Sequence, residues 1–361
     1  MTGFTLRDTL IRGINSCASD VHLSVGDVPM LRIDGNLVRV PDAQPLTAED
    51  MREAVHELLT ESQRERLEEE REYDFSFSLD MGVKEQRFRA NFSHEKGNPA
   101  LALRAITSNI RTMKQLGLPE DLKAMTRKNN GLFLVTGPTG SGKSTTLAAV
   151  IQEINLTRSV HIVTVEDPIE YLYNSEVALI HQRELGRDTK TFAEALRRAM
   201  RQDPDVIMIG EMRDLETISA AITAAETGHL VLATLHTRDA AQSIDRIIDV
   251  FPPYQQQQIR IQLSSMLLGV LSQQLIPLEG IPGRTVATEY LVATNAVRNY
   301  IREGKSSQIK NVIQTGSALG MHTMDQDLAR LCQKGMIGRR DALAHAYDVE
   351  SFNRYMMNGE V

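Results

Sequence analysis

The sequence predicts a two-domain α/β protein whose second domain is built on a parallel sheet. The chain has 361 residues, and at about 150 residues per domain that length favours two domains. Beyond residue 131, short apolar runs alternate with helical stretches, and each run ends in small, polar or charged residues. This order is typical of the buried strands of a parallel sheet. The first hundred residues instead carry alternating strands, which indicate a mixed α/β module.

Composition excludes several classes of protein. Hydrophobic residues make up 42% of the chain and charged residues 24%, as in ordinary folded proteins. The net charge of −7 has the wrong sign for a protein that coats nucleic acid or anionic lipid. The two cysteines, Cys17 and Cys332, are too few for a four-thiolate zinc site or a disulfide framework and indicate a reducing compartment. With no apolar run near the roughly 18 residues that span a bilayer and no signal-peptide stretch, we expect a cytosolic protein.

The N-terminal module is expected to open with a helix, a strand and a hairpin. The helix follows from the fourfold spacing of Leu6, Leu10 and Ile14. The hairpin follows from Asp34-Gly35, whose small residues tolerate the positive φ values of a tight turn. In order, these elements are a helix over 6–14, a strand over 20–25 and hairpin strands over 30–33 and 37–40.

Two helices and three more strands complete this module. Thr47, with Asp50 three residues later, is a capping signal for a helix that runs toward Leu59. We interpret the charge-rich helix that follows as a solvated face. The remaining elements are that second helix over 61–72 and strands over 73–79, 86–92 and 100–106.

The middle of these three strands has two unlike faces. Because side chains alternate along a strand, Phe88, Ala90 and Phe92 share one face. The alternate residues Arg87, Arg89 and Asn91 share the other face. The sequence therefore predicts a sheet with an apolar side and an arginine side.

A linker with a short helix is expected over residues 107–130, and we place the domain boundary near Leu116. The second domain should contain strands over 132–136, 160–165, 206–209 and 230–235. After Asp239 we expect strands mostly to stop and capped amphipathic helices to continue to about Tyr355. Ligands of such folds bind at the carboxyl ends of the parallel strands.

A phosphate-binding loop is the strongest local signal. The run Gly137, Pro138, Thr139, Gly140, Ser141, Gly142, Lys143 and Ser144 fits the phosphate-loop pattern, with a buried strand before it and a helical stretch after it. Its glycines let backbone N–H groups close around phosphate oxygens, and the helix N-terminus adds partial positive charge. Lys143 should reach the β and γ phosphates. Ser144 should bind Mg²⁺, with Thr145 beside it to donate to a phosphate.

Hydrolysis also needs a carboxylate that orients or deprotonates a water molecule. Glu211 follows the apolar strand 206–209, and Gly210 occupies the usual position of the Walker B aspartate. Magnesium coordination would therefore rest on Ser144, waters and phosphates, with Glu211 free to act as the base.

A second acidic segment follows the strand that ends at Val165. We choose Glu166 as the residue that polarises the water, because Pro168 stops the strand at the same expected sheet edge. Asp167 and Glu170 are either part of this site or ordinary loop acids, and the sequence leaves both readings open.

Two histidines bracket the strand 230–235. His229 and His236 lie at its two ends, which makes them candidates for sensing the γ-phosphate. A lone histidine is more often a hydrogen-bonded polar group than a ligand. Their spacing does not suggest a metal site, and two thiols leave a zinc ion without partners.

Four segments together resemble the motifs of the secretion-superfamily ATPases. The phosphate loop and residues 164–170, 210–214 and 228–237 are similar, in order, to the Walker A motif, Asp box, Walker B motif and His box of that superfamily. The superfamily also has glycine at the position of Gly210. Residues 296–303, AVRNYIRE, are similar to the Ala-Ile-Arg-Asn-Leu-Ile-Arg-Glu stretch of the PilT subfamily, the retraction ATPases of type IV pili.

This resemblance implies a fold, cofactors and partners. It implies a PAS-like α+β domain with linker over 1–115 and a RecA-like phosphate-loop ATPase core over 116–361 that ends in a helical extension. It implies a homohexameric motor that hydrolyses ATP with Mg²⁺ to drive pilus retraction, pilin depolymerisation and twitching motility. Its partners would be a PilC-like inner-membrane platform protein and the pilus machinery, without nucleic acid. The chain would lie in the cytoplasm, at the cytoplasmic face of the inner membrane.

The resemblance also assigns arginine fingers. Members of the superfamily insert arginines of the N-terminal domain onto the phosphates, and these map onto Arg89 and Arg104, with Arg111 as a weaker third. Such a guanidinium can be worth about 10³- to 10⁵-fold in rate. The alternative is a salt-bridged arginine on a sheet surface. Residues 296–303 are likewise either the element that couples hydrolysis to the partner or a plain packing helix.

Several rival functions remain open. A pilus-assembly or type II secretion ATPase would carry a further N-terminal domain and a four-cysteine metal site, which this sequence does not show. A PilU-like accessory of retraction is harder to separate. A DNA-translocating motor is disfavoured by the net charge and by the lack of tryptophan, and a non-hydrolysing nucleotide sensor is a further alternative.

Overall fold

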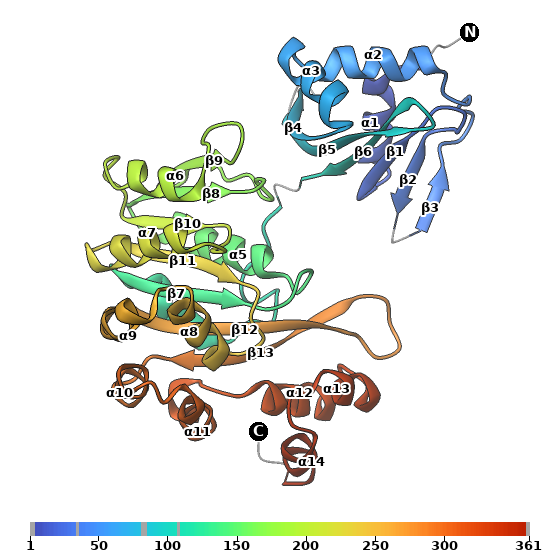
Figure 1. The fold of residues 1–361 in the computed structure, drawn as a ribbon. Helices are drawn as coiled ribbons and strands as arrows, with labels where there is room; N and C mark the ends of the chain where they lie inside the picture. The colour runs from blue at the N-terminus through green and yellow to red at the C-terminus, as the bar shows by residue number, and fades with distance from the viewer. Residues whose placement is uncertain (1–3, 34–35, 81–84, 107–108, 359–361) are drawn as a thin grey trace. The chain divides into compact units, whose positions relative to one another are not determined.

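The computed structural model describes residues 4–33, 36–80, 85–106 and 109–358 and divides the chain into two compact units (Figure 1). The N-terminal unit comprises Met1–Ser108 with Glu170–Leu172, and the C-terminal unit comprises Asn109–Ile169 with Tyr173–Val361. The sequence led us to expect the division after residue 115. Each unit has its own sheet and its own hydrophobic core.

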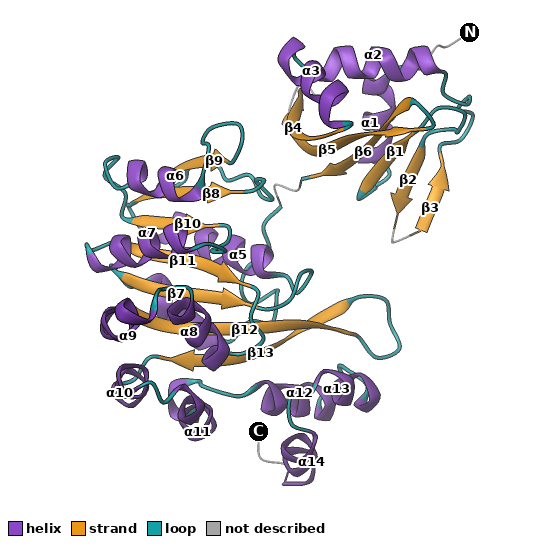
Figure 2. Cartoon of the chain, viewed as in Figure 1, coloured by secondary structure: helices purple, strands orange, loops and turns teal. Residues whose placement is uncertain are grey.

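The N-terminal unit is a six-stranded antiparallel sheet with helices on one face (Figure 2). Its strand order is β3 (Asn36–Arg39), β2 (Met30–Ile33), β1 (Asp20–Leu23), β6 (Asn98–Ala105), β5 (Glu85–Glu95) and β4 (Glu72–Asp80). Its helices are α1 (Leu6–Asn15), α2 (Ala48–Leu58) and α3 (Glu61–Glu70). Buried side chains of all three helices join those of the sheet in one core. The predicted strands of the hairpin pair as expected, and the predicted turn at Asp34-Gly35 lies outside the described residues.

Local signals explain where these helices begin. The Thr47 hydroxyl accepts from the N–H of Asp50 while the Asp50 carboxylate accepts from the N–H of Thr47, so the predicted capping box is confirmed. In α3 only Leu67 is buried. Its charged residues therefore form the solvated face that the sequence predicts.

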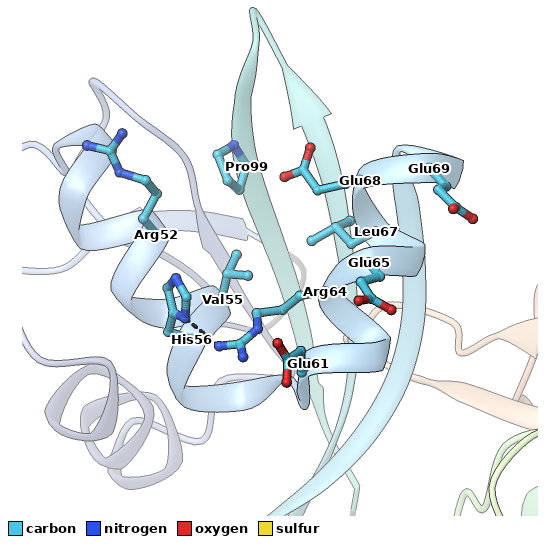
Figure 3. A pocket seen from close by; sticks show the side chains of 10 residues that line it. All are labelled: Arg52, Val55, His56, Glu61, Arg64, Glu65, Leu67, Glu68, Glu69 and Pro99. Carbon is cyan, nitrogen blue, oxygen red and sulfur yellow. Dashed lines mark hydrogen bonds between the residues drawn. The ribbon is translucent and has the colours of Figure 1, made fainter.

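A cavity of about 610 Å³ lies between α2 and α3 (Figure 3). Figure 3 shows charged side chains around it, including Arg52 and Glu68, with Val55 and Leu67 between the helices. Arg64 contacts the His56 ring across it. None of the residues that the sequence singled out for chemistry lines this cavity.

The faces of β5 are as predicted. Phe88, Ala90 and Phe92 are each at most 1% exposed, and two of their rings stack on Phe75 and Phe77 of β4. Aromatic pairs of this kind add to the free energy of burial. The opposite face of the strand carries the arginines.

The C-terminal unit is built on a seven-stranded sheet. The strand order is β13 (Arg284–Val292), β12 (Leu267–Pro277), β7 (Gly131–Thr136), β11 (Leu230–Leu235), β10 (Val206–Ile209), β8 (His161–Glu166) and β9 (Leu179–Glu184). All neighbours are parallel except β12 and β13. The four predicted strands of this domain are confirmed, and they form the centre of the sheet.

The expectation that strands mostly stop after Asp239 is wrong, because β12 and β13 form a long hairpin that extends the sheet. The helix α9 (Pro253–Met266) ends where β12 begins, at Leu267. No turn residue separates the two elements, so the apolar run 266–271 continues the helical pattern. The edge strand β9 also escaped prediction, since its side chains are partly exposed along most of its length.

Helices cover both faces of this sheet (Figure 2). On one face lie α6 (Phe192–Ala199), α7 (Leu215–Glu226), α8 (Ala240–Asp249) and α9. On the other lie the short α4 (Lys123–Thr126) and α5 (Lys143–Thr157). The core strands are therefore buried on both sides, which explains their continuous apolar sequences.

The last part of the chain that the structure describes is mainly α-helical, in agreement with the predicted helical extension. Its α-helices are α10 (Asn295–Glu303), α11 (Ile309–Thr315), α12 (Met324–Gln333), α13 (Arg339–His345) and α14 (Val349–Asn358). Buried residues of α12, α13 and α14 pack against Ile276 and Ala287 of the β12–β13 hairpin. Within the described residues, no helix has both the length and the apolar character needed to cross a membrane.

Within α10, Val297 and Ile301 are fully buried, and Arg298 acts as an anchor. Its guanidinium donates to the carbonyl oxygens of Ser264, Ser265 and Leu267 at the end of α9, and to that of Ala293. The carbonyls at a helix end need such partners. This helix therefore serves a packing role, while Arg302 and Glu303 remain exposed.

We expect Arg298→Ala to lower the free energy of unfolding by about 2–3 kcal/mol, because several bonds from a charged donor to backbone carbonyls would be lost. Urea unfolding of the full chain would measure this loss. Arg302→Ala, which removes an exposed arginine from the same helix, is the control. Equal midpoints for the two variants would contradict the anchoring role.

Candidate active site

The candidate site lies at one edge of the C-terminal sheet. The parallel strands β7, β8, β10 and β11 all end at this edge, where Thr136 pairs with Leu235 and Val165 with Ile209. The phosphate loop follows β7 directly, and the two acidic segments follow β8 and β10. The fold therefore brings together segments that are up to a hundred residues apart in the sequence.

Glycine is required at two points of the phosphate loop. Gly137 and Gly142 have φ values of +145° and +88°, which side chains rarely tolerate. A Cβ atom at Gly137 would lie 2.4 Å from the carbonyl oxygen of Gln273. The loop is thus pressed against β12, and α5 begins at Lys143 immediately after it.

Lys143 is held inside the loop. Its Nζ donates to the carbonyl oxygens of Gly137 at 2.9 Å and Pro138 at 3.0 Å, and the residue is 9% exposed. Ser144 and Thr145 follow in the first turn of α5, both half-buried. The ammonium group therefore lies within the phosphate loop, next to the N-terminus of α5, and helix N-termini of this kind bind phosphates.

Glu211 is brought next to His236, as the sequence motifs led us to expect of a shared site. The Glu211 Oε2 atom lies 3.4 Å from Nε2 of His236, and its Oε1 atom accepts from Nε of Arg213 at 2.8 Å. The Glu211 side chain is 16% exposed. Both carboxylate oxygens are thus oriented by cationic or ionisable partners at the sheet edge.

Glu166 is buried at the end of β8, where its carboxylate accepts hydrogen bonds from two side chains. Its Oε1 atom accepts from Thr164 Oγ1 at 2.7 Å and from Gln182 Nε2 at 3.1 Å. Asp167 and Glu170, whose role the sequence left open, are exposed. Glu166 is therefore more buried than these two acidic neighbours.

Steric crowding explains why glycine occupies position 210. A Cβ atom there would lie 3.3 Å from both Cα of Glu166 and the carbonyl oxygen of Val165, which is closer than ordinary van der Waals contact. An aspartate at this position would push against the end of β8. Glu211, one residue later, is the nearest position of this strand end that can carry a carboxylate toward the site.

His229 lies at the opposite edge of the sheet. It precedes β11, and its carbonyl oxygen accepts from the N–H of Gly131 at the start of β7. Six residues of strand, at about 3.3 Å each, place it about 20 Å from the edge that carries the phosphate loop. Its Nδ1 atom bonds the carbonyl oxygen of Ala224. His229 therefore lies away from the phosphate loop of its own chain, whereas His236 lies at the same sheet edge as that loop, and the sensing role of both stays a prediction.

The two candidate arginine fingers form a cross-strand pair in the N-terminal unit. Arg89 of β5 lies directly opposite Arg104 of β6, and Asp20 of β1 lies opposite Arg104 on the other side. Arg104 Nε donates to Asp20 Oδ1 at 2.8 Å. Burial raises the pKa of Asp20, but hydrogen bonds from Ser19 and Arg104 outweigh it and hold the pKa below its ordinary value.

Arg111, the weaker third candidate, belongs to the C-terminal unit. It lines a cavity of about 750 Å³ beside the phosphate loop, together with Gly142, Thr145 and Thr146. The polar rim and apolar wall of this cavity, which includes Leu275 and Val286, suit a nucleoside.

Sequence reasoning missed Gln273 of β12. This side chain is 1% exposed, and its Nε2 atom donates to the carbonyl oxygen of Ser141 at 2.7 Å. It therefore holds the phosphate loop from the neighbouring strand and lines the same cavity. A glutamine within an apolar run was the available signal, but the strand that contains it was not predicted.

Comparisons with known proteins agree on the kind of chain this is. The family model described as "Type II/IV secretion system protein" matches residues 5–335. The chain is similar to the type IV pilus retraction ATPase PilT of Pseudomonas aeruginosa, with 48% identity over 93% of this chain and 96% of the relative. A twitching motility protein of Neisseria gonorrhoeae is 46% identical over 90% of this chain and 86% of its own length.

A solved structure extends this likeness to the fold. The crystal structure of the pilus retraction motor PilT with bound ADP superimposes with a TM-score of 0.91 at 44% identity, and the match covers 98% of this chain and all of the other. The predicted fold class is thereby confirmed.

Proposed function

Because the chain belongs to the Type II/IV secretion system protein family, we propose that it is the ATPase motor that retracts type IV pili. The chain is an ATPase of this family, and its relatives include a pilus retraction ATPase. The proposal rests on one observation above all. A phosphate loop, the buried Glu166, and the pair of Glu211 and His236 meet at one edge of one parallel sheet.

Nucleotide binding is assigned to the phosphate loop and the cavity beside it. The loop amides, the start of α5 and Lys143 would bind the phosphates. The cavity lined by Arg111, Thr145 and Gln273 would take the nucleoside. Gln273, whose Nε2 atom already bonds the loop, links these two parts.

The residues at the site fit a bound Mg²⁺ ion. Its preferred ligands are oxygen atoms, and it commonly keeps several waters and binds phosphates through few protein groups. Ser144 offers a hydroxyl in the first turn of α5, while a side chain at Gly210 would be crowded by the backbone of Val165 and Glu166. Ser144 would hold the ion, which would supply charge neutralisation at the phosphates.

Glu211 is assigned the role of general base. It would accept a proton from the attacking water. His236, 3.4 Å from its Oε2 atom, would orient the carboxylate toward the γ-phosphate. Glu166, fixed by Thr164 and Gln182, would polarise the same water. Such a base contributes about 10²- to 10⁴-fold to the rate.

The arginine pair of the N-terminal unit is assigned to the transition state. Asp20 holds the Nε side of Arg104, and the guanidinium can still present its Nη donors to a phosphate. Arg89, directly opposite on the sheet, would add a second cation. Since the phosphate loop belongs to the other unit, closure of one domain on another would accompany catalysis.

We further propose that six copies form a ring and that this closure performs the mechanical work. A ligand can bias a two-state arrangement only through its different affinity for the two states, and the arginine pair provides such a difference. A PilC-like platform protein at the cytoplasmic face of the inner membrane would receive the motion. The assignment of residues 1–115 as PAS-like and 116–361 as RecA-like belongs to this proposal.

Deletion of the gene in its own organism tests the function. We expect cells that keep their surface pili but cannot retract them, measured as lost twitching with undiminished piliation. Loss of pili would contradict retraction and favour an assembly ATPase. Retraction that persists at low force would favour a PilU-like accessory, and strong stimulation of ATP turnover by DNA would favour a translocase.

A further inference from the structure

The segment that carries His236 is held from the side of the C-terminal helices. It follows β11 and leads into α8. The hydroxyl of Tyr347, in the loop between α13 and α14, donates to the carbonyl oxygen of Arg238 at 2.6 Å. The N–H of Ala240 donates to Oε1 of Glu289, on β13, at 2.9 Å. Two distant side chains thus bind the backbone of residues 236–240, and we call Tyr347 and Glu289 the loop clamp.

The loop clamp is itself fixed in place. The N–H of Tyr347 donates to Oδ1 of Asp325 at 2.7 Å, and Asp325, in the first turn of α12, is 1% exposed. Glu289 is 3% exposed in the strand that packs on α12. The position of the 236–240 backbone is therefore tied to the packing of the C-terminal helices on the β12–β13 hairpin.

Charged residues from several elements lie around the loop clamp. A cavity of about 450 Å³ separates them, lined by Asp239 of the loop, Asp325 of α12, Lys310 of α11 and Arg238, besides the loop clamp. The pKa of Glu289 is raised to about 7, mainly by burial and further by the charges of Asp239 and Asp325. The hydrogen bond from Ala240 and the charge of Lys310 oppose this rise. The residue therefore changes charge near neutral pH.

We propose that Tyr347 and Glu289 are positioning residues for ATP hydrolysis, which hold residues 236–240 so that His236 stays beside Glu211. This inference rests on the proposed function, since it takes Glu211 and His236 as the groups that act on the attacking water. His236 is two residues from the carbonyl that Tyr347 binds, so a shift of that backbone moves the imidazole. Small misplacements of this kind lower turnover without a change in the groups themselves.

The loop clamp should act on turnover and not on nucleotide affinity. Neither Tyr347 nor Glu289 is among the described residues that line the cavity beside the phosphate loop. The loop clamp is also fixed to α12, so a partner that moves α12 would change the hydrolysis rate. The C-terminal helices would in this way couple movement of the partner to ATP hydrolysis.

Tyr347→Phe tests the proposal with the loss of a single hydroxyl. We expect kcat to fall about fivefold, the equivalent of one hydrogen bond, with KM and the affinity for a fluorescent ADP analogue unchanged within twofold. The control is Tyr355→Phe, which removes a hydroxyl from α14 in the same helical region and should keep the wild-type kcat. Both measurements use the full chain, with thermal unfolding midpoints recorded alongside.

Glu289→Gln adds a readout that a purely structural role would not move. Glutamine keeps the acceptor for the N–H of Ala240, but it does not titrate. A carboxylate is a stronger acceptor than a neutral group, so the wild type should hold the loop best above pH 7. We expect the ratio of wild-type to variant kcat to shrink as the pH falls from 8 to 6.

Wild-type kcat in Tyr347→Phe would overturn the proposal, as would equal losses of kcat and nucleotide affinity. A pH-independent ratio for Glu289→Gln would overturn the part assigned to Glu289. These failures are distinct from failure of the proposed function. If Glu211→Gln is inactive while Tyr347→Phe turns over ATP normally, the catalytic assignment stands and the loop clamp does not.

Discussion

Glu211→Gln is expected to bind ATP with near wild-type affinity and to hydrolyse it about 10²- to 10⁴-fold more slowly, the range for loss of a general base. The amide keeps the shape of the side chain and can still contact His236 and Arg213, but it cannot take up the proton of the attacking water. Phosphate release under single-turnover conditions measures the chemical step, and a fluorescent nucleotide measures the affinity.

Two further variants serve as controls for this result. Glu216→Gln removes an exposed carboxylate at the start of α7 and should leave turnover unchanged. Lys143→Ala should lose nucleotide binding itself, because the phosphates lose their cation. Wild-type turnover in Glu211→Gln would remove Glu211 from the role of base.

Arg104→Ala should fold and bind nucleotide but lose about 10³-fold or more in kcat. That is the lower end of the effect of an arginine finger on phosphoryl transfer. Within the described residues, the exposed Arg104 side chain is bound to Asp20 through Nε, so its loss costs little stability. Steady-state ATP turnover at saturating nucleotide is the measurement.

Arg104→Lys and Arg66→Ala serve as its controls. Lysine keeps the charge but not the planar fork of donors, so it should restore turnover only in part. Arg66 is an exposed arginine of α3 in the same unit, and its removal should have no effect. A kcat within twofold of wild type for Arg104→Ala would leave this residue as an ordinary sheet-surface arginine.

The central strands and the phosphate loop could be predicted because their signals are local. Each of these strands is an apolar run bounded by small or charged residues, and the loop pattern is contiguous in the sequence. By contrast, β12 follows α9 with no intervening turn and carries Gln273 and Gln274 in its middle. Its burial follows from pairing with β7, which local sequence does not reveal.

The pairing of the two arginines depends on strand register. Arg89 and Arg104 lie opposite each other because the hairpin between β5 and β6 turns at Lys96-Gly97, both with positive φ. A two-residue turn of this kind fixes every pair along the ladder. This turn was readable in the sequence, and counting outward from it would have placed the arginines together.

The contrast between the two histidines has an equally simple geometric cause. His229 and His236 flank the same strand, so their separation is the length of that strand. Only the residue at the carboxyl end can join the acidic groups. The distance was implied by the sequence, but the shared motif suggested a shared location.

The proposed motor requires that assembled copies, and not a single chain, carry out ATP turnover. The decisive measurement is the ATP turnover rate per chain of the full-length wild type across a protein dilution series, with the mass of the particle determined by light scattering in the same samples. We predict that the rate per chain falls as the assembly dissociates. A monomer that consumes ATP at the full rate would contradict the account.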